Sequence, residues 1–194
     1  ASARTDALYL KPVKPIPARK IAEKVPLISC FIAPCTHGCP IGQDIPEYVK
    51  LVGGGRYADA LRLILEKNPL PFITGTICPH RCTDKCTRGF YEEFIHIRDC
   101  KLLAAQNGFD GVIGSLKPAG GSAANVAIVG GGPAGMAAAF FLARQGARAT
   151  IFEQRGQLGG VVRYVIPAFR ISEEQIDHDA ALLGAMGAEI RTNT

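Results

Sequence analysis

The sequence of 194 residues has no apolar run near 18 residues and no hydrophobic segment near its first residue. The first absence excludes a membrane-spanning helix, and the second does not fit a secretory signal peptide. An excess of positive charge is also missing from most of the chain. Residues 1–24 hold six Lys/Arg against two carboxylates, which accounts for +4 of the formal net charge of +5. We therefore expect no nucleic-acid partner, and the proline-rich residues 1–24 predict an extended arm or linker.

Cysteine is absent after residue 100, and all seven cysteines lie within 71 residues. An odd number leaves one thiol unpaired if the others form disulfides, so metal-bound thiolates in a reducing cytoplasm fit better. Short spacings bring the thiolates to one point, and Cys39 before Pro40 is typical of the last ligand in an iron–sulfur run. The candidate metal ligands are Cys30, Cys35, Cys39, Cys78, Cys82, Cys86 and Cys100.

Zinc and iron–sulfur clusters both take about four ligands per site, so seven cysteines leave two sites one ligand short. An alternative is a non-enzymatic assembly or adaptor module, in which zinc or clusters merely fold the protein. A neighbouring dinucleotide motif favours clusters, because clusters exchange electrons with a redox cofactor and zinc does not. The region is small, mostly α-helical and rich in loops, with little core of its own, so bound clusters would supply much of its folding energy.

The dinucleotide motif lies in the second half of the chain. Residues 126–129 predict a strand, 133–145 a helix and 149–153 a second strand, which together form a parallel βαβ unit. The turn holds Gly130, Gly131, Gly132, Pro133, Ala134 and Gly135. Its glycines allow a tight turn, approach of a pyrophosphate to the helix N-terminus, and close helix packing. Glu153 ends the second strand, where a carboxylate binds ribose hydroxyls.

A second glycine pair, Gly159 and Gly160, favours FAD over NAD(P) as the ligand of this fold. No residue has the pattern of an acid–base or nucleophilic catalyst, so the chemistry would belong to the cofactors. Ser172 predicts the N-terminus of a helix over 173–186, and a third strand begins at Glu189. We expect an FAD domain that is truncated at Thr194, and hence a site that binds FAD weakly by itself.

The cysteine region is predicted to be helical. Asp44 caps a helix that runs to Leu51, and residues 56–67 and 95–106 form two more. Residues 68–71 are predicted to begin a loop, Pro79 to interrupt the segment 78–86, and Asn107 with Gly108 to end the last helix. The predicted organisation is an arm (1–24), a helical [4Fe–4S] domain (25–115), a linker (116–124) and the truncated α/β, Rossmann-like FAD domain (125–194).

The segments 33–41, 44–48, 77–79, 89–99, 126–153 and 158–170 resemble the start of the glutamate synthase small (beta) subunit. The same domain opens dihydropyrimidine dehydrogenase. Segments 25–31 and 69–76 are most similar to bacterial proteins named as selenate reductase subunits. The resemblance implies two [4Fe–4S] clusters, an FAD, and NADPH bound by a later domain of the parent protein. It implies part of an NAD(P)H-dependent oxidoreductase whose electrons reach a partner domain or subunit.

The resemblance also implies ligand sets. One cluster would use Cys30, Cys35 and Cys86, and the other Cys39, Cys78 and Cys82. A further family cysteine is replaced by Leu27, and the family's Gln or Glu ligand falls near Lys101, which cannot bind iron as an ammonium. Cys100 either supplies that missing thiolate or is a packed helical thiol. Val161 and Arg170 take positions that contact FAD in relatives, whereas Arg163 is expected to be solvated.

Overall fold

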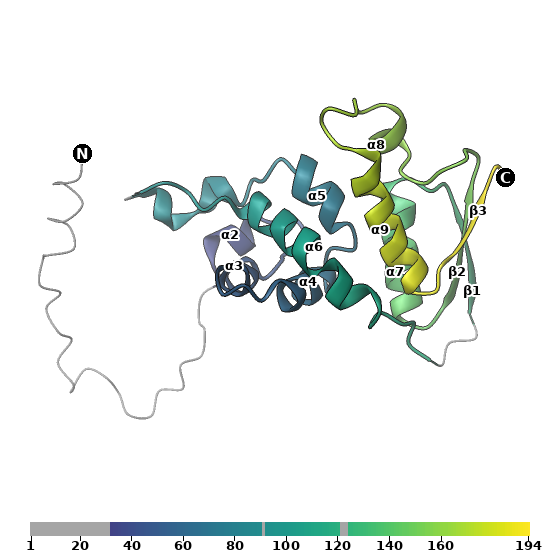
Figure 1. The fold of residues 1–194 in the computed structure, drawn as a ribbon, viewed down its shortest axis with the longest axis horizontal. Helices are drawn as coiled ribbons and strands as arrows, with labels where there is room; N and C mark the ends of the chain where they lie inside the picture. The colour runs from purple at the N-terminus through teal and green to yellow at the C-terminus, as the bar shows by residue number, and fades with distance from the viewer. Residues whose placement is uncertain (1–31, 91, 121–123) are drawn as a thin grey trace, which may run out of the picture. The chain divides into compact units, whose positions relative to one another are not determined.

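The computed structural model describes residues 32–90, 92–120 and 124–194, so the predicted arm and Cys30 lie outside the described residues. Figure 1 shows its helices and strands. In chain order they are α2 (Pro34–His37), α3 (Ile45–Gly53), α4 (Tyr57–Leu65), α5 (Pro71–Ile77), the 3₁₀ helices η2 (Thr83–Lys85) and η3 (Thr87–Phe90), α6 (Ile97–Ile113), β1 (Asn125–Val129), α7 (Pro133–Arg144), β2 (Arg148–Glu153), α8 (Val161–Tyr164), α9 (Glu173–Ala185) and β3 (Glu189–Thr192).

The first helices follow the sequence signals closely. The Asp44 side chain accepts a hydrogen bond from the backbone N–H of Glu47, at 3.4 Å, and so begins α3. The amphipathic segment forms α4, and Pro79 separates α5 from the short helix η2 as predicted. Among the described residues, no helix is both long and apolar enough to cross a membrane.

The prediction that Asn107 and Gly108 end the third helix is wrong, because α6 continues to Ile113. The reason is a tertiary contact rather than a local one. A Cβ atom on Gly108 would lie 2.6 Å from the backbone oxygen of Tyr57, at the start of α4. Glycine is therefore used here for the close approach of two helices, and α6 packs along α4 through this point.

Residues 68–71 were predicted to end the preceding helix and begin a loop. Residues 68–70 are indeed non-helical, but the loop ends there, because Pro71 is the first residue of α5. Proline suits this place, where its missing N–H has no partner in the helix. Asn68 supports the turn, since its side-chain oxygen accepts from the Leu70 N–H at 3.2 Å. Its amide nitrogen donates to the Thr74 hydroxyl at 2.7 Å. The chain therefore turns directly from α4 into α5.

The second half forms the predicted βαβ unit and its continuation. The strands pair in parallel in the order β1-β2-β3, with Val129 opposite Phe152 and Phe152 opposite Arg191. Helices α7 and α9 lie on the same side of this sheet (Figure 1). Ser172 begins α9 with a reciprocal capping box to Gln175, as its sequence position predicts.

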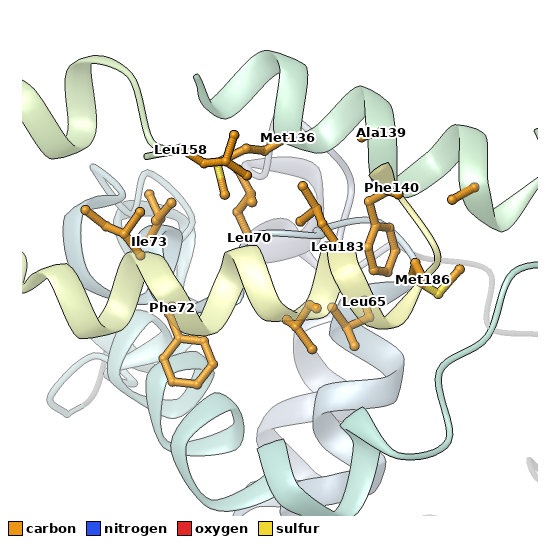
Figure 2. Packing of buried hydrophobic residues seen from close by; sticks show 14 of the residues in the cluster. Leu65, Leu70, Phe72, Ile73, Met136, Ala139, Phe140, Leu158, Leu183 and Met186 are labelled. Atoms are coloured by element: carbon orange, nitrogen blue, oxygen red, sulfur yellow. The ribbon is translucent and has the colours of Figure 1, made fainter. Parts of the chain in front are cut away.

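Two hydrophobic clusters hold these elements together. The smaller one lies within the helices next to the cysteines, and includes Ile45, Tyr48, Ile64 and Ile97. The larger one is shared by the helical part and the α/β part. Figure 2 shows Leu65, Leu70 and Ile73 of the helical part in one cluster with Leu183 and Met186 of the α/β part, all with at most 5% of their surface exposed. The helical part therefore has more apolar packing than its sequence pattern predicted, and 33–194 is one compact unit.

Candidate functional site

Three of the predicted ligands line one cavity. Cys39, Cys78 and Cys82 lie on the wall of a space of about 370 Å³. Its wall is formed by α3, by α6 and by the segments that follow α2 and α5. Local structure places each thiol. Cys39 follows α2, and its N–H donates to the Thr36 oxygen at 3.1 Å. Cys78 stands in extended conformation where Pro79 ends α5, and Cys82 immediately precedes η2. The sequence spacing thus brings together three thiols from two separate segments.

The wall of this cavity is cationic as well as thiol-bearing. Arg81, Arg98 and Lys101 line it, and none of the described lining residues is Asp or Glu. Burial lowers the pKa of Lys101, while Cys78, Cys39 and Cys82 act in the opposite direction. Burial also raises the pKa of Cys82, and Lys101 opposes that rise. The cavity therefore suits a bound group that carries negative charge.

Two cysteines belong to a second group. Cys35 lies in α2 and Cys86 follows η2, and neither lines the cavity. The pKa of the Cys35 thiol is raised mainly by burial, against hydrogen bonds from Thr36 and its own backbone, and Cys86 adds to the rise. Their third predicted partner, Cys30, lies outside the described residues, so the structure brings together only Cys35 and Cys86 of this set.

Tyr48 is a further residue of the cavity, which its sequence did not reveal. Its side chain is buried and lines the cavity from α3. Burial raises the pKa of Tyr48 above its usual value, and four thiols contribute in the same direction. These thiols are Cys82, Cys39, Cys100 and Cys35, which come from both groups. The sequence signal that could have identified Tyr48 is its place on a predicted helix close to the cysteines.

Cys100 is half-buried on α6, where it packs against the smaller hydrophobic cluster, and it is not among the described lining residues of the cavity. Burial, and secondarily Asp99, raises the pKa of its thiol. Among the described residues, no three His, Cys, Asp or Glu side chains lie close enough together to bind a single metal ion. Ligation by Cys100 stays a prediction.

The glycine turn forms the second candidate site. Gly130 directly follows β1 and has φ of +97°, a conformation that favours glycine. The N–H of Gly131 donates to the Glu153 carboxylate at 2.6 Å, and the Arg155 N–H donates to its other oxygen at 2.9 Å. A Cβ on Gly135 would lie 2.0 Å from the Gly130 oxygen, so the predicted close packing of the helix on the turn is present. Pro133 and Ala134 form the first turn of α7.

The second glycine pair packs directly against this turn. The Gly159 N–H donates to the Gly131 oxygen at 2.8 Å. Gly160 has φ of +51°, and a Cβ there would lie 2.8 Å from the Cα of Gly132. The structure therefore joins the two glycine motifs into one surface beside Glu153. Val161, at the start of α8, and Arg170 are both exposed.

The expectation that Arg163 is solvated is wrong, because 2% of its side chain is exposed. Its guanidinium donates to the Leu158 oxygen at 2.6 Å and forms ion pairs with Glu173 and Asp177 of α9. A single exposed-looking arginine beside a glycine pair gives no sequence signal of such a role. Arg163 thus ties the segment that carries Gly159 and Gly160 to α9.

Comparison with known proteins finds matches in both halves of the chain. Residues 16–110 match the family of dihydropyrimidine dehydrogenase domain II, 4Fe-4S cluster, and residues 128–187 match the NAD(P)-binding Rossmann-like domain. The putative oxidoreductase YgfK of Escherichia coli (strain K12) is 47% identical over 191 residues, which are 97% of this chain and 18% of that protein.

Two further relatives, like the first, are much longer than the region that matches this chain. The glutamate synthase [NADPH] small chain of Mycobacterium tuberculosis (strain H37Rv) is 36% identical over 84% of this chain and 34% of its own length. The NADPH-Fe(3+) oxidoreductase subunit beta of Geobacter sulfurreducens (strain PCA) is 32% identical over 91% of this chain and 27% of its own length. The chain thus spans between 18% and 34% of these relatives. The chain is similar to the glutamate synthase small chains, and its two matched regions are a 4Fe-4S domain followed by a Rossmann-like NAD(P)-binding domain.

Proposed function

We propose that this chain is the electron-transfer portion of an NAD(P)H-dependent flavin and iron–sulfur oxidoreductase. In this function electrons pass between FAD and two [4Fe–4S] clusters and then to a partner domain or subunit. The observation that carries the proposal is the cavity lined by Cys39, Cys78 and Cys82 beside three cationic side chains. Thiolates are the ligands of such clusters, and cations offset the negative charge of a thiolate-bound cluster.

The cysteines would form two sets of ligands, one for each cluster. Cys39, Cys78 and Cys82 would hold one cluster, with Cys100 as the candidate fourth ligand. Cys35 and Cys86, together with Cys30, would hold the other. When bound, each cluster accepts and releases one electron at a time. The protein would hold the thiolates in place, and the buried Tyr48 and the cationic side chains of the cavity would set the polarity and charge around them.

The glycine surface would hold the flavin. Gly130 to Gly135 and the N-terminus of α7 would hold the pyrophosphate, and Glu153, which here accepts from the Gly131 N–H, would also accept hydrogen bonds from ribose hydroxyls. Gly159, Gly160, Val161 and Arg170 would complete the contacts. The matching family is named for NAD(P), whereas the adjoining second glycine pair favours FAD. We therefore propose FAD here and NADPH at a further domain of the parent protein.

The names of the relatives support the proposal of a partner domain or subunit that accepts the electrons. Some of them are named as a small chain of glutamate synthase, a beta subunit of a formate dehydrogenase, or a beta subunit of an iron(III) oxidoreductase. By similarity, this chain would pass electrons to another domain or subunit in the cytoplasm. Its resemblance to selenate reductase subunits makes selenate the first terminal acceptor to assay.

The direct test is metal analysis of protein that is purified without oxygen. We expect about eight iron and eight sulfide per chain, and release of FAD on denaturation of the full-length protein. Cys82→Ala should lose about half of the iron, whereas Ser115→Ala, a hydroxyl far from the cavity wall, should lose none. Stoichiometric zinc without sulfide would contradict the proposal and favour a metal-folded adaptor module instead.

A further inference from the structure

Cys100 and Lys101 are neighbours on α6, but only one of them lines the cysteine cavity. Successive side chains on a helix point about 100° apart, so Cys100 and Lys101 cannot face the same way. It is Lys101 that lines the cavity together with Cys39, Cys78 and Cys82, and only 6% of its surface is exposed. The side chain at the place of the family's oxygen ligand is therefore a buried cation that faces three thiols.

A buried ammonium requires compensation, because removal of a charge from water costs several kcal/mol unless opposite charge lies nearby. No ion pair within 4.0 Å joins Lys101 to a carboxylate among the described residues. Arg98 lines the same cavity and adds positive charge rather than offsetting it. Within the cavity, the groups that can supply negative charge are the three thiolates and whatever they bind.

We propose that Lys101 is a fixed cation that stabilises the reduced form of the cluster held by Cys39, Cys78 and Cys82, and so raises its reduction potential. This inference rests on the proposed function. An electron that entered the cluster would make it more negative by one charge, with no bond formed or broken. Lys101 would keep its proton, and its attraction to the cluster would increase.

The test is a redox titration by EPR of the anaerobic full-length protein and its variants. In Lys101→Gln the cation is lost. We expect at least a tenfold fall in the ratio of reduced to oxidised cluster at a fixed potential, about 59 mV for one electron. Only one of the two clusters should shift, and iron and sulfide should remain at wild-type levels. Lys101→Arg, which keeps the charge, should stay closer to the wild type than Lys101→Gln.

The matched control is Lys50→Gln, because this lysine of α3 loses the same charge but its side chain is 76% exposed. Its titration should equal that of the wild type. An unchanged potential in Lys101→Gln, with normal iron, would overturn the inference and leave the proposed function intact. Absence of iron and sulfide from the wild type would instead refute the proposed function.

A measurement on the wild type covers the case in which variants at Lys101 fail to fold. In protein labelled with ¹⁵N at the lysine side chains, pulsed EPR of the reduced cluster detects nitrogen bound to iron through its strong coupling. We expect only the weak coupling of a nearby, unbound ammonium. A strong coupling would show that Lys101 is a neutral ligand of iron, and would overturn its role as a cation.

Discussion

Replacement of Asp179 should weaken the joint between the two parts of the protein. This residue lies on α9 with no exposed surface, yet its carboxylate accepts from the backbone N–H groups of Phe72, at 3.1 Å, and Ile73, at 2.8 Å. Both belong to the first turn of α5, where N–H groups have no partner within the helix. Asp179 therefore caps a helix that is more than 100 residues away in sequence.

The structure sets the size of the effect. Asp179→Ala leaves both N–H groups buried without a partner, at a cost of about 1–3 kcal/mol each in the free energy of unfolding. Asp179→Asn keeps one acceptor oxygen but turns an amide N–H₂ toward the second donor, so its loss should be about half as large. The expected order of stability is therefore wild type, then Asn, then Ala.

The loss should also depend on pH. Burial raises the pKa of Asp179 to about 8, against the two backbone donors and Lys101, which lower it. The usual value for an unfolded chain is about 3.9, so the folded state holds the proton more tightly. The stability contributed by this group is thus full below the unfolded pKa and is lost as the pH rises toward the folded pKa. The advantage of the wild type over Asp179→Ala should shrink from about pH 4 to about pH 8.

Urea titrations followed by far-UV circular dichroism measure these differences, and hydrogen exchange at Phe72 and Ile73 reports the local loss. Asp110→Ala, an exposed carboxyl on α6, is the control for removal of one acidic side chain. If Asp179→Ala unfolds within about 0.5 kcal/mol of this control at every pH, the capping argument is refuted.

Three further predictions concern the two candidate sites. Cys100→Ala should lower the iron content by about half if Cys100 is the fourth ligand, whereas full iron and an unchanged EPR spectrum would make it a packed thiol. Gly160→Ala should weaken FAD binding by at least tenfold, measured by fluorescence titration, because its Cβ would lie 2.8 Å from the Gly132 backbone at φ of +51°. Gly114→Ala, where a Cβ meets nothing within 4 Å, should bind as the wild type, and equal affinities would contradict the steric argument. Arg163→Gln should cost about 1–3 kcal/mol in the free energy of unfolding through its bond to the Leu158 oxygen, and an unchanged melting temperature would count against it.

The parts of the fold that the sequence predicts are those with local causes. The cap at Asp44, the capping box at Ser172 and the glycine turn after β1 each depend on residues within a few positions of one another. The end of α6 and the start of α5 were predicted wrongly because their causes are tertiary or ambiguous. Gly108 ends no helix when it meets the backbone of Tyr57, and Pro71 suits a helix start as well as a loop.

The candidate site divides in the same way. Cysteine spacing indicates that thiols converge, and Cys39, Cys78 and Cys82 do share a cavity. Spacing does not fix the rotation of α6, so it cannot decide whether Cys100 or Lys101 faces that cavity. Nor does it predict the burial of Arg163, which depends on where α9 packs. These features arise from the relative placement of distant segments.

The shared hydrophobic cluster limits how this architecture can be recombined. A cysteine domain that is cut out and joined to a different flavoprotein would expose Leu65, Leu70 and Ile73, which now pack with residues of α7 and α9. It would also leave the first turn of α5 without the carboxylate that caps it. A working chimaera should therefore keep the packing faces of α7 and α9 with the cysteine helices, and place the exchange point beyond them rather than in the linker that precedes β1.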